Sequence, residues 1–450
     1  MAIMLDRFKN SLQGMASKVA TKAAEVNTKV AENAKKDEGD QYLVGLDIGT
    51  EFVKALIGKV VDEGKGIEII GVGRAHQDLS DMQAGAIADI ASVVENCDKA
   101  LAIAEQQSGV SARTAVIGIA GELVKGTTTT VRVTRKTSDK PLDLVEVERI
   151  IKLVQARAEA KAKRQLAWEL GGKEVEVRLV NSALVGIEID GYKVTSPIGF
   201  QGRDVVVQLY TAFAPMIHIG ALERTAQQLD LDLLAVAAEP FAVARSVIGD
   251  DTSASMNAIL MDVGGGTTDI AVITDGGVQG TKMFGIGGRA YTRAVERELN
   301  IEFSQAEKLK VGLSGGDVPS GKVSAVEGAL KKTLDVWMSG VELALAEFPK
   351  LDHLPHRLLL CGGGSSLDLL MDKLESGNWY GELPFTKKPT VHHIEPEQVV
   401  GITDSTGHIT DHTFITAMGL LRVGLDTLQF SVTPDKGGSV RDKIDRILRV

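Results

Sequence analysis

The first 40 residues carry large apolar side chains at helical spacing. From Met4 to Val30 the apolar positions advance in steps of 4, 4, 3, 4, 4, 3 and 4. Those steps make an 11-residue repeat, which matches a nearly straight α-helix. The apolar positions are Met4, Phe8, Leu12, Met15, Val19, Ala23, Val26 and Val30. The pattern ends in the polar run 35–40, which contains the helix-stopping Gly39.

This predicted helix is basic, although the whole chain is acidic. Residues 1–36 contain seven Lys or Arg and three Asp or Glu, so 7 − 3 = +4, against a net charge of −10 for the chain. A long basic amphipathic helix is typical of a segment that lies on an anionic bilayer. Two other interpretations stay open: a helix that docks on its own protein or on another helix, and a loose tail.

After residue 41 the pattern changes to short β-rich runs. Residues 42–47, 52–60 and 67–72 predict a three-strand antiparallel meander. A similar series recurs at 257–262, 269–274 and 277–283. In both series an apolar strand runs into an Asp-X-Gly turn and a second strand, which indicates an internal duplication.

Helices and further strands fill the rest of the chain, so the pattern predicts an α/β protein. We expect helices at 84–107, 143–167, 217–229, 288–299, 304–311, 324–347, from 367 onward, 414–425 and 439–450. We expect the remaining strands at 114–119, 127–135, 175–185, 205–214 and 357–361.

Composition narrows the function classes. The 44% hydrophobic content supports buried cores, and the acidic balance gives no sign of nucleic-acid binding. The two cysteines, Cys97 and Cys361, lie in no metal-ligand pattern and suit a reducing cytoplasm. No apolar run approaches the ~18 residues of a membrane-spanning helix.

Two loops at the ends of the duplicated strands carry the pattern of phosphate-binding loops. In each, a strand ends in an Asp that can hold a metal-bound water, and glycines then let backbone N–H groups approach phosphate oxygens. Thr hydroxyls add donors. Facing each other, the loops would hold a nucleoside triphosphate and its Mg²⁺. The first loop contributes Asp47, Gly49 and Thr50, and the second Asp262, Gly264, Gly265, Gly266, Thr267 and Thr268.

A third glycine-rich loop follows the strand at 357–361. Gly362, Gly363, Gly364 and Ser365 leave room for a flat base or ribose and lead into a helix N-terminus. An ordinary strand-to-helix turn is the alternative.

On these motifs the chain resembles the actin-like ATPases and, within them, the FtsA family of bacterial cell division. The loops at 47–50, 262–269 and 359–365 resemble the family's two phosphate motifs and its adenosine motif. Residues 237–240 and 417–421 resemble its two connecting segments. The helix at 304–310 is similar to one whose Glu and Lys reach ribose and adenine, which implies Glu307 and Lys310 here, unless they form an exposed ion pair.

The resemblance covers residues 41–430 and implies a ribonuclease-H-like duplicated, two-domain actin-like fold with an FtsA-type inserted small domain. The implied division assigns 1–40 to an N-terminal helix and linker, and 41–83, 181–231 and 410–430 to domain I. It assigns 84–180 to the inserted domain, 232–409 to domain II and 431–450 to a linker and C-terminal amphipathic helix. The long N-terminal helix departs from the usual family pattern.

The resemblance also implies a function. We expect an ATP- and Mg²⁺-binding protein that self-associates into filaments at the inner face of the cytoplasmic membrane, at the division site. Its partners would be the tubulin-like protein FtsZ, other membrane proteins of the division machinery and an anionic membrane surface, but no nucleic acid. Membrane contact is expected from Met4, Phe8, Leu12, Met15 and Val19, and from Val440, Ile444, Ile447 and Leu448. The alternatives are a PilM-like pilus scaffold and a small-molecule kinase of the same superfamily.

Hydrolysis of ATP would need a positioned water, Mg²⁺ and charge stabilisation. Asp47 and Asp262 are the candidates to hold hydrated Mg²⁺, and Glu239, before Pro240, is the candidate to orient the attacking water. A structural helix cap is the alternative role for Glu239. Whether the protein turns over ATP is left open by the sequence.

Overall fold

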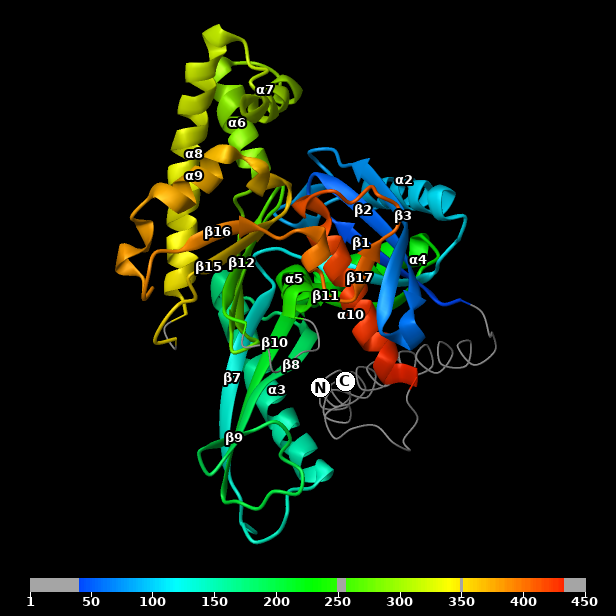
Figure 1. Cartoon of the computed structure of the whole chain (residues 1–450), viewed down its shortest axis with the longest axis vertical. Helices are drawn as coiled ribbons and strands as arrows, with labels where there is room; N and C mark the ends of the chain where they lie inside the picture. The colour runs from blue at the N-terminus through cyan, green and yellow to red at the C-terminus, as the bar shows by residue number, and fades with distance from the viewer. Residues whose placement is uncertain (1–39, 249–255, 349–350, 433–450) are drawn as a thin grey trace, which may run out of the picture.

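The computed structural model describes residues 40–248, 256–348 and 351–432. Two large sheets organise this part of the chain, and Figure 1 shows them side by side with helices packed around each. The predicted helices at 1–36 and 439–450, with every membrane-contact residue assigned to them, lie outside the described residues.

The first sheet has six strands in the order β11-β6-β1-β2-β3-β17. The expected meander is confirmed, because β1, β2 and β3 pair antiparallel in sequence. The register puts the Gly45 and Gly73 positions on opposite faces. Helix α10 (Ile415–Val432) packs on the first face and α2 (Ile90–Ser108) on the second. The strands are β1 (Tyr42–Ile48), β2 (Phe52–Val61), β3 (Gly66–His76), β6 (Thr114–Ile119), β11 (Asp232–Ala238) and β17 (Ile402–Asp404).

The second sheet repeats this arrangement and confirms the duplication. Its order β14-β13-β12-β15-β16 reproduces β3-β2-β1-β6-β11, with an antiparallel meander followed by two parallel strands. The strands are β12 (Ala258–Val263), β13 (Thr268–Thr274), β14 (Gly277–Phe284), β15 (Arg357–Cys361) and β16 (Thr390–His393). A separate core packs against this sheet from α6 (Gly288–Leu299), α7 (Phe303–Gly315), α8 (Ser320–Ala346) and α9 (Asp368–Ser376).

A small domain extends the second sheet beyond β14. Strands β7 (Lys125–Thr134), β10 (Asp204–Pro215), β8 (Val177–Ile189) and β9 (Tyr192–Val194) continue the sheet, and α3 (Leu144–Glu169) packs against β7, β8 and β10. Figure 1 shows this unit below the two main sheets. Its own core includes Ile151, Val154 and Leu209.

These pairings move the boundaries that we expected for the inserted segment. β6 and α2 (Ile90–Ser108) belong to the first sheet and its core, although we had placed 84–119 in the inserted domain. β8, β9 and β10 belong with the small domain, although 181–215 had been placed in domain I. The reason is long-range strand pairing, which local pattern does not reveal.

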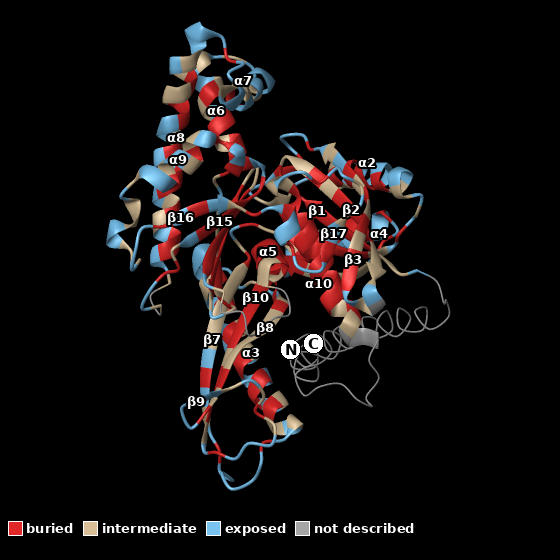
Figure 2. Cartoon of the chain, in the orientation of Figure 1, coloured by how far each residue is buried: buried red, intermediate tan, exposed pale blue. Residues whose placement is uncertain are grey.

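Two helices connect the halves where the resemblance placed the connecting segments. α5 (Glu239–Ile248) and α10 (Ile415–Val432) pack against each other, and a β-carbon on Gly419 would lie 2.5 Å from the carbonyl oxygen of Ala242. Glycine therefore permits direct backbone contact between the helices. Figure 2 shows how strongly both helices are buried at the centre of the molecule.

Some local predictions were wrong. The helix expected from residue 84 begins at Ile90, because β4 (Met82–Gln83) and β5 (Ala86–Ile87) form a tight hairpin with positive φ at Ala84 and Gly85. The Asp89 side chain caps that helix by accepting hydrogen bonds from the Ala91 and Ser92 N–H groups. Strands β11, β16 and β17 and helix α5 were missed; α4 (Met216–Gln228) lies as expected within one residue.

The packing of β3 on α2 gives a stability prediction. A β-carbon on Gly73 would lie 1.8 Å from the carbonyl oxygen of Ala100, so Gly73→Ala would push the helix away from the sheet. We expect the free energy of unfolding to fall by about 1–3 kcal/mol or more. Gly328→Ala is the control, since Gly328 has open space on α8, and should raise stability by about 0.5–1 kcal/mol. Urea unfolding measures both; equal stability of Gly73→Ala and wild type would contradict the packing.

Candidate functional site

Lys54 faces Asp47 beside the turn of the first hairpin. The two residues are register partners on β1 and β2, so their side chains share one face of the sheet. The Lys54 Nζ lies 2.9 Å from the Asp47 Oδ2, and both side chains are largely buried. Burial opposes the charge of Lys54, but Asp47 and Asp262 outweigh it and raise the pKa of the ammonium. The first phosphate loop therefore presents a buried, charged ion pair.

The second hairpin has two carboxylates in the equivalent positions. Asp262 and Asp269 are register partners on β12 and β13, where the first half has Asp47 and Lys54. The Thr416 hydroxyl, on α10, donates to the Asp262 Oδ2, and the Thr267 hydroxyl donates to the Asp269 Oδ2 over 3.1 Å. The Asp269 Oδ1 is buried and has no hydrogen-bond partner among the described residues.

Four buried carboxyl groups thus lie in this region, together with the one buried ammonium group of Lys54 that pairs with Asp47. Burial raises the pKa of Glu239 well above its usual value, and Asp47, Asp269 and Asp262 add to the effect. The pKa of Asp269 is likewise raised by burial and then by Asp262. Burial also raises the pKa of Asp262, although Thr416 and Lys54 oppose it. An excess of carboxyl groups with raised pKa values is a site that gains stability from a cation.

This donor set suits Mg²⁺ held through water. Among residues 40–248, 256–348 and 351–432, no three His, Cys, Asp or Glu side chains form a direct metal-ligand cluster. Hydrated Mg²⁺ keeps several waters and needs only one or two carboxylates together with phosphate oxygens. Asp47 and Asp262 can hold such an ion, and the unpartnered Asp269 oxygen can accept from one of its waters.

The two phosphate loops touch each other. A β-carbon on Gly266 would lie 2.6 Å from the Thr50 Oγ1, and one on Gly265 would lie 2.8 Å from the Glu51 Cβ. The second loop also meets the start of α6, where the Gly288 N–H donates to the Gly264 carbonyl over 2.9 Å. Glycine at these positions is required by the close approach of the loops.

A charged bridge joins the two halves beside these loops. Arg289, in the first turn of α6, places its Nε 2.6 Å from the Glu51 Oε2, while the other Glu51 oxygen lies 2.9 Å from the His76 Nε2. Arg289 also donates to the backbone carbonyls of Gln77 and Asp78 over 3.2 and 3.4 Å. The bridge holds domain II against β1–β3, so it favours a closed arrangement of the loops.

The adenosine loop packs on the second phosphate loop. A β-carbon on Gly364 would lie 3.0 Å from the Gly264 carbonyl oxygen, and Gly362, with φ of +81°, lies directly against Asp262. The buried Ser365 hydroxyl donates to the Gly362 carbonyl over 2.7 Å and so closes the loop on itself. Gly363 has open space where its side chain would be.

Glu307 and Lys310 sit next to this loop system. The Lys310 Nζ lies 2.7 Å from the Glu307 Oε2 and donates to the Thr292 hydroxyl over 3.0 Å and to the Gly288 carbonyl over 3.3 Å. The pair is therefore tied to the start of α6, where Gly288 is hydrogen-bonded to Gly264 of the second phosphate loop. A pair that faces ribose or adenine would need to lie close to that loop.

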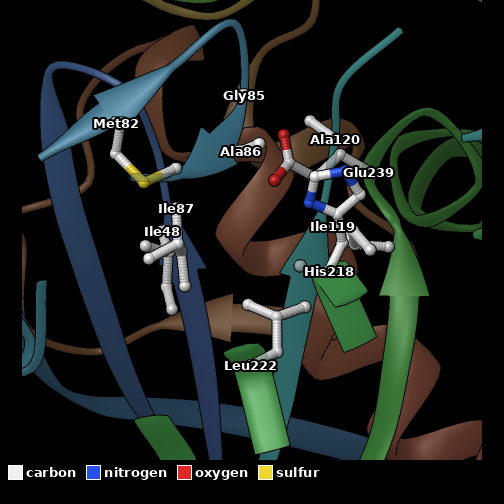
Figure 3. A pocket seen from close by; sticks show the side chains of 11 residues that line it. Ile48, Met82, Gly85, Ala86, Ile87, Ile119, Ala120, His218, Leu222 and Glu239 are labelled. Atoms are coloured by element: carbon white, nitrogen blue, oxygen red, sulfur yellow. The ribbon is translucent and has the colours of Figure 1, made fainter. Parts of the chain in front are cut away.

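Glu239 closes the far end of the site. It begins α5, and a β-carbon on Gly118 would lie 2.9 Å from its Oε1. A cavity of ≈ 20 Å³ lies beside it, lined also by His218, Gly85, Gly118 and Ala120. Figure 3 shows the Glu239 carboxyl group and the His218 imidazole at one side of this cavity, opposite Met82 and Ile87. That volume holds one water molecule, so Glu239 has a place for an ordered water.

The structure brings the predicted residues of the three loops together, but the Thr268 hydroxyl serves the scaffold. Thr268 donates to the Ile286 carbonyl over 2.7 Å and accepts from the Trp337 Nε1 over 2.9 Å, and it is fully buried. Lys54, Asp269 and Arg289 were missed as site residues. For two of them a signal exists: each lies seven positions after the loop aspartate of its hairpin, since 54 − 47 = 269 − 262 = 7.

The raised pKa values predict a pH dependence of stability. In the unfolded chain Glu239 and Asp269 ionise near their ordinary values of ~4. The folded state holds the protons to higher pH, so the free energy of unfolding falls as pH rises above ~4 and through the raised folded values. We expect Glu239→Gln to flatten this fall in urea unfolding between mildly acidic and mildly basic pH. Glu302→Gln, at an exposed site, should leave it unchanged; parallel curves for Glu239→Gln and wild type would contradict the assignment.

The chain is similar in sequence to known proteins of one family. A family model described as "Cell division protein FtsA" matches residues 259–419. The chain is 24% identical over 427 residues to the cell division protein FtsA of Pseudomonas aeruginosa, covering 89% of this chain and 94% of that protein. It is 24% identical over 428 residues to that of Neisseria meningitidis serogroup B, covering 90% and 95%.

A solved structure shows the same fold. The PilM–PilN type IV pilus biogenesis complex superposes with a TM-score of 0.61 and 16% identity, covering 87% of this chain and 99% of that one. At this identity the likeness concerns the fold alone, and with the duplicated sheets it confirms the expected α/β, actin-like two-domain architecture. The family model and the relatives, which align along nearly their whole length, show that the chain is similar to cell division protein FtsA.

Proposed function

We propose that the chain is an ATP-binding division protein that polymerises at the inner face of the cytoplasmic membrane and tethers the tubulin-like FtsZ filament there. The observation that carries the proposal is the meeting of two phosphate loops and an adenosine loop around four carboxyl groups and Lys54. The relatives named as cell division protein FtsA supply the setting. Recruitment of later membrane proteins of the division machinery completes the proposed role.

Nucleotide binding would act through the closure of the two halves. ATP and hydrated Mg²⁺ would be held by Asp47, Thr50 and the second phosphate loop, with the base beside Glu307, Lys310 and the glycine loop. Because Arg289 already bridges the halves through Glu51, phosphates bound between the loops would set how closely the halves approach. Glu239 would orient a water for slow hydrolysis, which would then work as a switch between closures.

Attachment to the membrane would come from the chain ends. Nowhere in the described residues does a helix have the length and apolar content to cross a bilayer. The amphipathic patterns at 4–30 and 440–450 would instead lie on an anionic surface, and two modest anchors on one molecule bind far better than one. The protein would thus be peripheral at the division site.

Two other functions, a PilM-like scaffold and a small-molecule kinase, fit parts of the sequence. A PilM-like scaffold would bind a short peptide of a membrane partner and would need no C-terminal amphipathic segment. A small-molecule kinase would need a catalytic Asp placed for a substrate hydroxyl. The four carboxyl groups at the loops are all buried around Lys54, which favours a nucleotide-and-metal site over a separate acceptor pocket.

Vesicle flotation tests the membrane part of the proposal, and filament pelleting tests its nucleotide-dependent part. Wild-type protein, a variant lacking 1–36 and a variant lacking 440–450 are floated with phosphatidylglycerol-containing vesicles, and ATP-dependent filaments are sought on those vesicles by pelleting and electron microscopy. We expect flotation to fall with each deletion, and FtsZ to float only with the full chain. Unchanged flotation of both deletion variants, or persistent monomers with lipid and ATP, would overturn the proposal.

A further inference from the structure

Helix α3 of the small domain presents a basic, partly apolar outer face. Its inner side packs on β7, β8 and β10 through residues such as Ile151, Val154 and Leu166. With 26 residues the helix is ~39 Å long. Five basic residues recur along it at steps of 3, 5, 4 and 3, so at ~3.6 residues per turn they spread over about half of the helix circumference. They are Arg149, Lys152, Arg157, Lys161 and Arg164, all exposed.

The acidic residues of α3 do not cancel this charge. Each of its four glutamates is committed to an ion pair: Glu146 with Arg135, Glu148 with Lys152, Glu159 with Lys163 and Glu169 with Lys125. Among the described residues, no acidic side chain forms an ion pair with Arg149, Arg157 or Arg164. Three arginines therefore remain as net positive charge on a chain that is acidic overall.

Large apolar side chains are exposed on the same helix. Trp168 is 82% exposed, Val145 73% and Leu153 42%. Trp168 lies four positions after Arg164 and Leu153 four positions after Arg149, so both share the face of the arginines. Exposed Trp beside Arg and Lys is typical of surfaces that contact the headgroup region of a bilayer.

We propose that this outer face of α3 is a second membrane-contact surface, which docks on the anionic headgroups of the bilayer. A single convex helix offers no groove for a peptide, but its length and its three arginines without an acidic partner among the described residues match a flat, negatively charged surface. The attraction is electrostatic, at about 1 kcal/mol for each basic residue near such a surface. Like the proposed function, this surface requires a protein that works at the membrane. It rests on α3, however, and not on the chain ends.

The test reverses the three arginines in the full chain. Arg149→Glu, Arg157→Glu and Arg164→Glu are combined, and binding to vesicles of phosphatidylglycerol and phosphatidylcholine is measured at low salt. We expect about tenfold weaker binding or more, and the same loss for wild type at high salt, where charges are screened. The control combines Lys322→Glu, Lys387→Glu and Lys388→Glu, which makes the same change of charge at exposed sites elsewhere and should bind as wild type does.

A spectroscopic readout locates the contact on α3. Of the three tryptophans, Trp337 is fully buried and Trp379 is partly buried, so Trp168 dominates the accessible emission. A lipid-borne quencher in the vesicles should quench wild type, but neither the triple arginine variant nor Trp168→Phe. Quenching should persist, more weakly, in the protein that lacks 1–36 and 440–450.

The outcomes separate the two proposals. If the wild type floats while Trp168 stays unquenched and the triple variant floats equally well, the α3 surface is overturned and the terminal anchors stand. If Trp168 is quenched and neither terminal deletion weakens flotation, the α3 surface stands and the terminal anchors fall. Quenching of Trp168 by an acidic polypeptide carrying the quencher, and not by vesicles, would assign the face to a protein partner and overturn the proposal.

Discussion

Replacing Lys54 by methionine is expected to destabilise the protein by about 3–5 kcal/mol and to abolish binding of Mg-ATP. The positive charge of Lys54 favours ionisation of both Glu239 and Asp262, because it lowers the pKa of each carboxyl group against the effect of burial. Removing one partner of a buried ion pair leaves the other charge buried without compensation, which is the reason for the large effect. Its ammonium group is also the nearest candidate to neutralise a phosphate between the loops.

The matched control is Lys59→Met on the same strand. Lys59 lies 2.8 Å from Asp40, but both side chains are partly exposed, at 33% and 53%. Surface pairs of this kind contribute little to stability, so urea unfolding should separate the two variants clearly. If Lys54→Met and Lys59→Met lose the same small amount, the four carboxyl groups do not depend on Lys54.

Asp262→Ala is expected to weaken binding of Mg-ATP by about 100-fold or more while the fold is kept. Asp262 accepts from Thr416 and lies against Gly362, so it links the second phosphate loop, the adenosine loop and α10. Loss of a group that orients a bound metal typically costs 10–100-fold in affinity, and contact with the adenosine loop adds to this. Burial raises the pKa of Asp262 and repulsion by Asp47 adds to it, so the substitution removes a carboxyl group whose charge is costly to bury.

Two readouts on the same variant keep this prediction decisive. Isothermal titration gives the affinity for Mg-ATP, and urea unfolding checks that Asp262→Ala is folded. Asp232→Ala, at an exposed position at the start of β11, controls for loss of charge. Unchanged affinity in a folded Asp262→Ala protein would refute the site.

The loop sites could be predicted from the sequence because they are local. Asp47 and Asp262 each end an apolar strand and precede glycines, and these features are visible in a short window. Lys54 and Asp269 required the hairpin register, which the meander implies once both strands are aligned with their turn. Arg289 could not be found in this way, because its partners Glu51, Gln77 and Asp78 are more than 200 positions earlier in the chain.

The small domain shows where local pattern fails. β6 and β8 look alike as apolar runs, yet β6 pairs in parallel with β1 while β8 pairs with β10. Only the partner strand decides which sheet β6 or β8 joins. The domain boundaries expected at residues 84 and 181 therefore differed from the structure. Strand β11 was missed because its run of Leu and Ala also suits a helix.

Titration of Mg-ATP into the wild-type protein tests the central claim most directly. The account predicts saturable binding of one nucleotide per chain that requires Mg²⁺ and is lost in Asp262→Ala and Lys54→Met. Absence of binding by folded wild-type protein, or equal binding by all three proteins, would contradict an ATP site between the two phosphate loops.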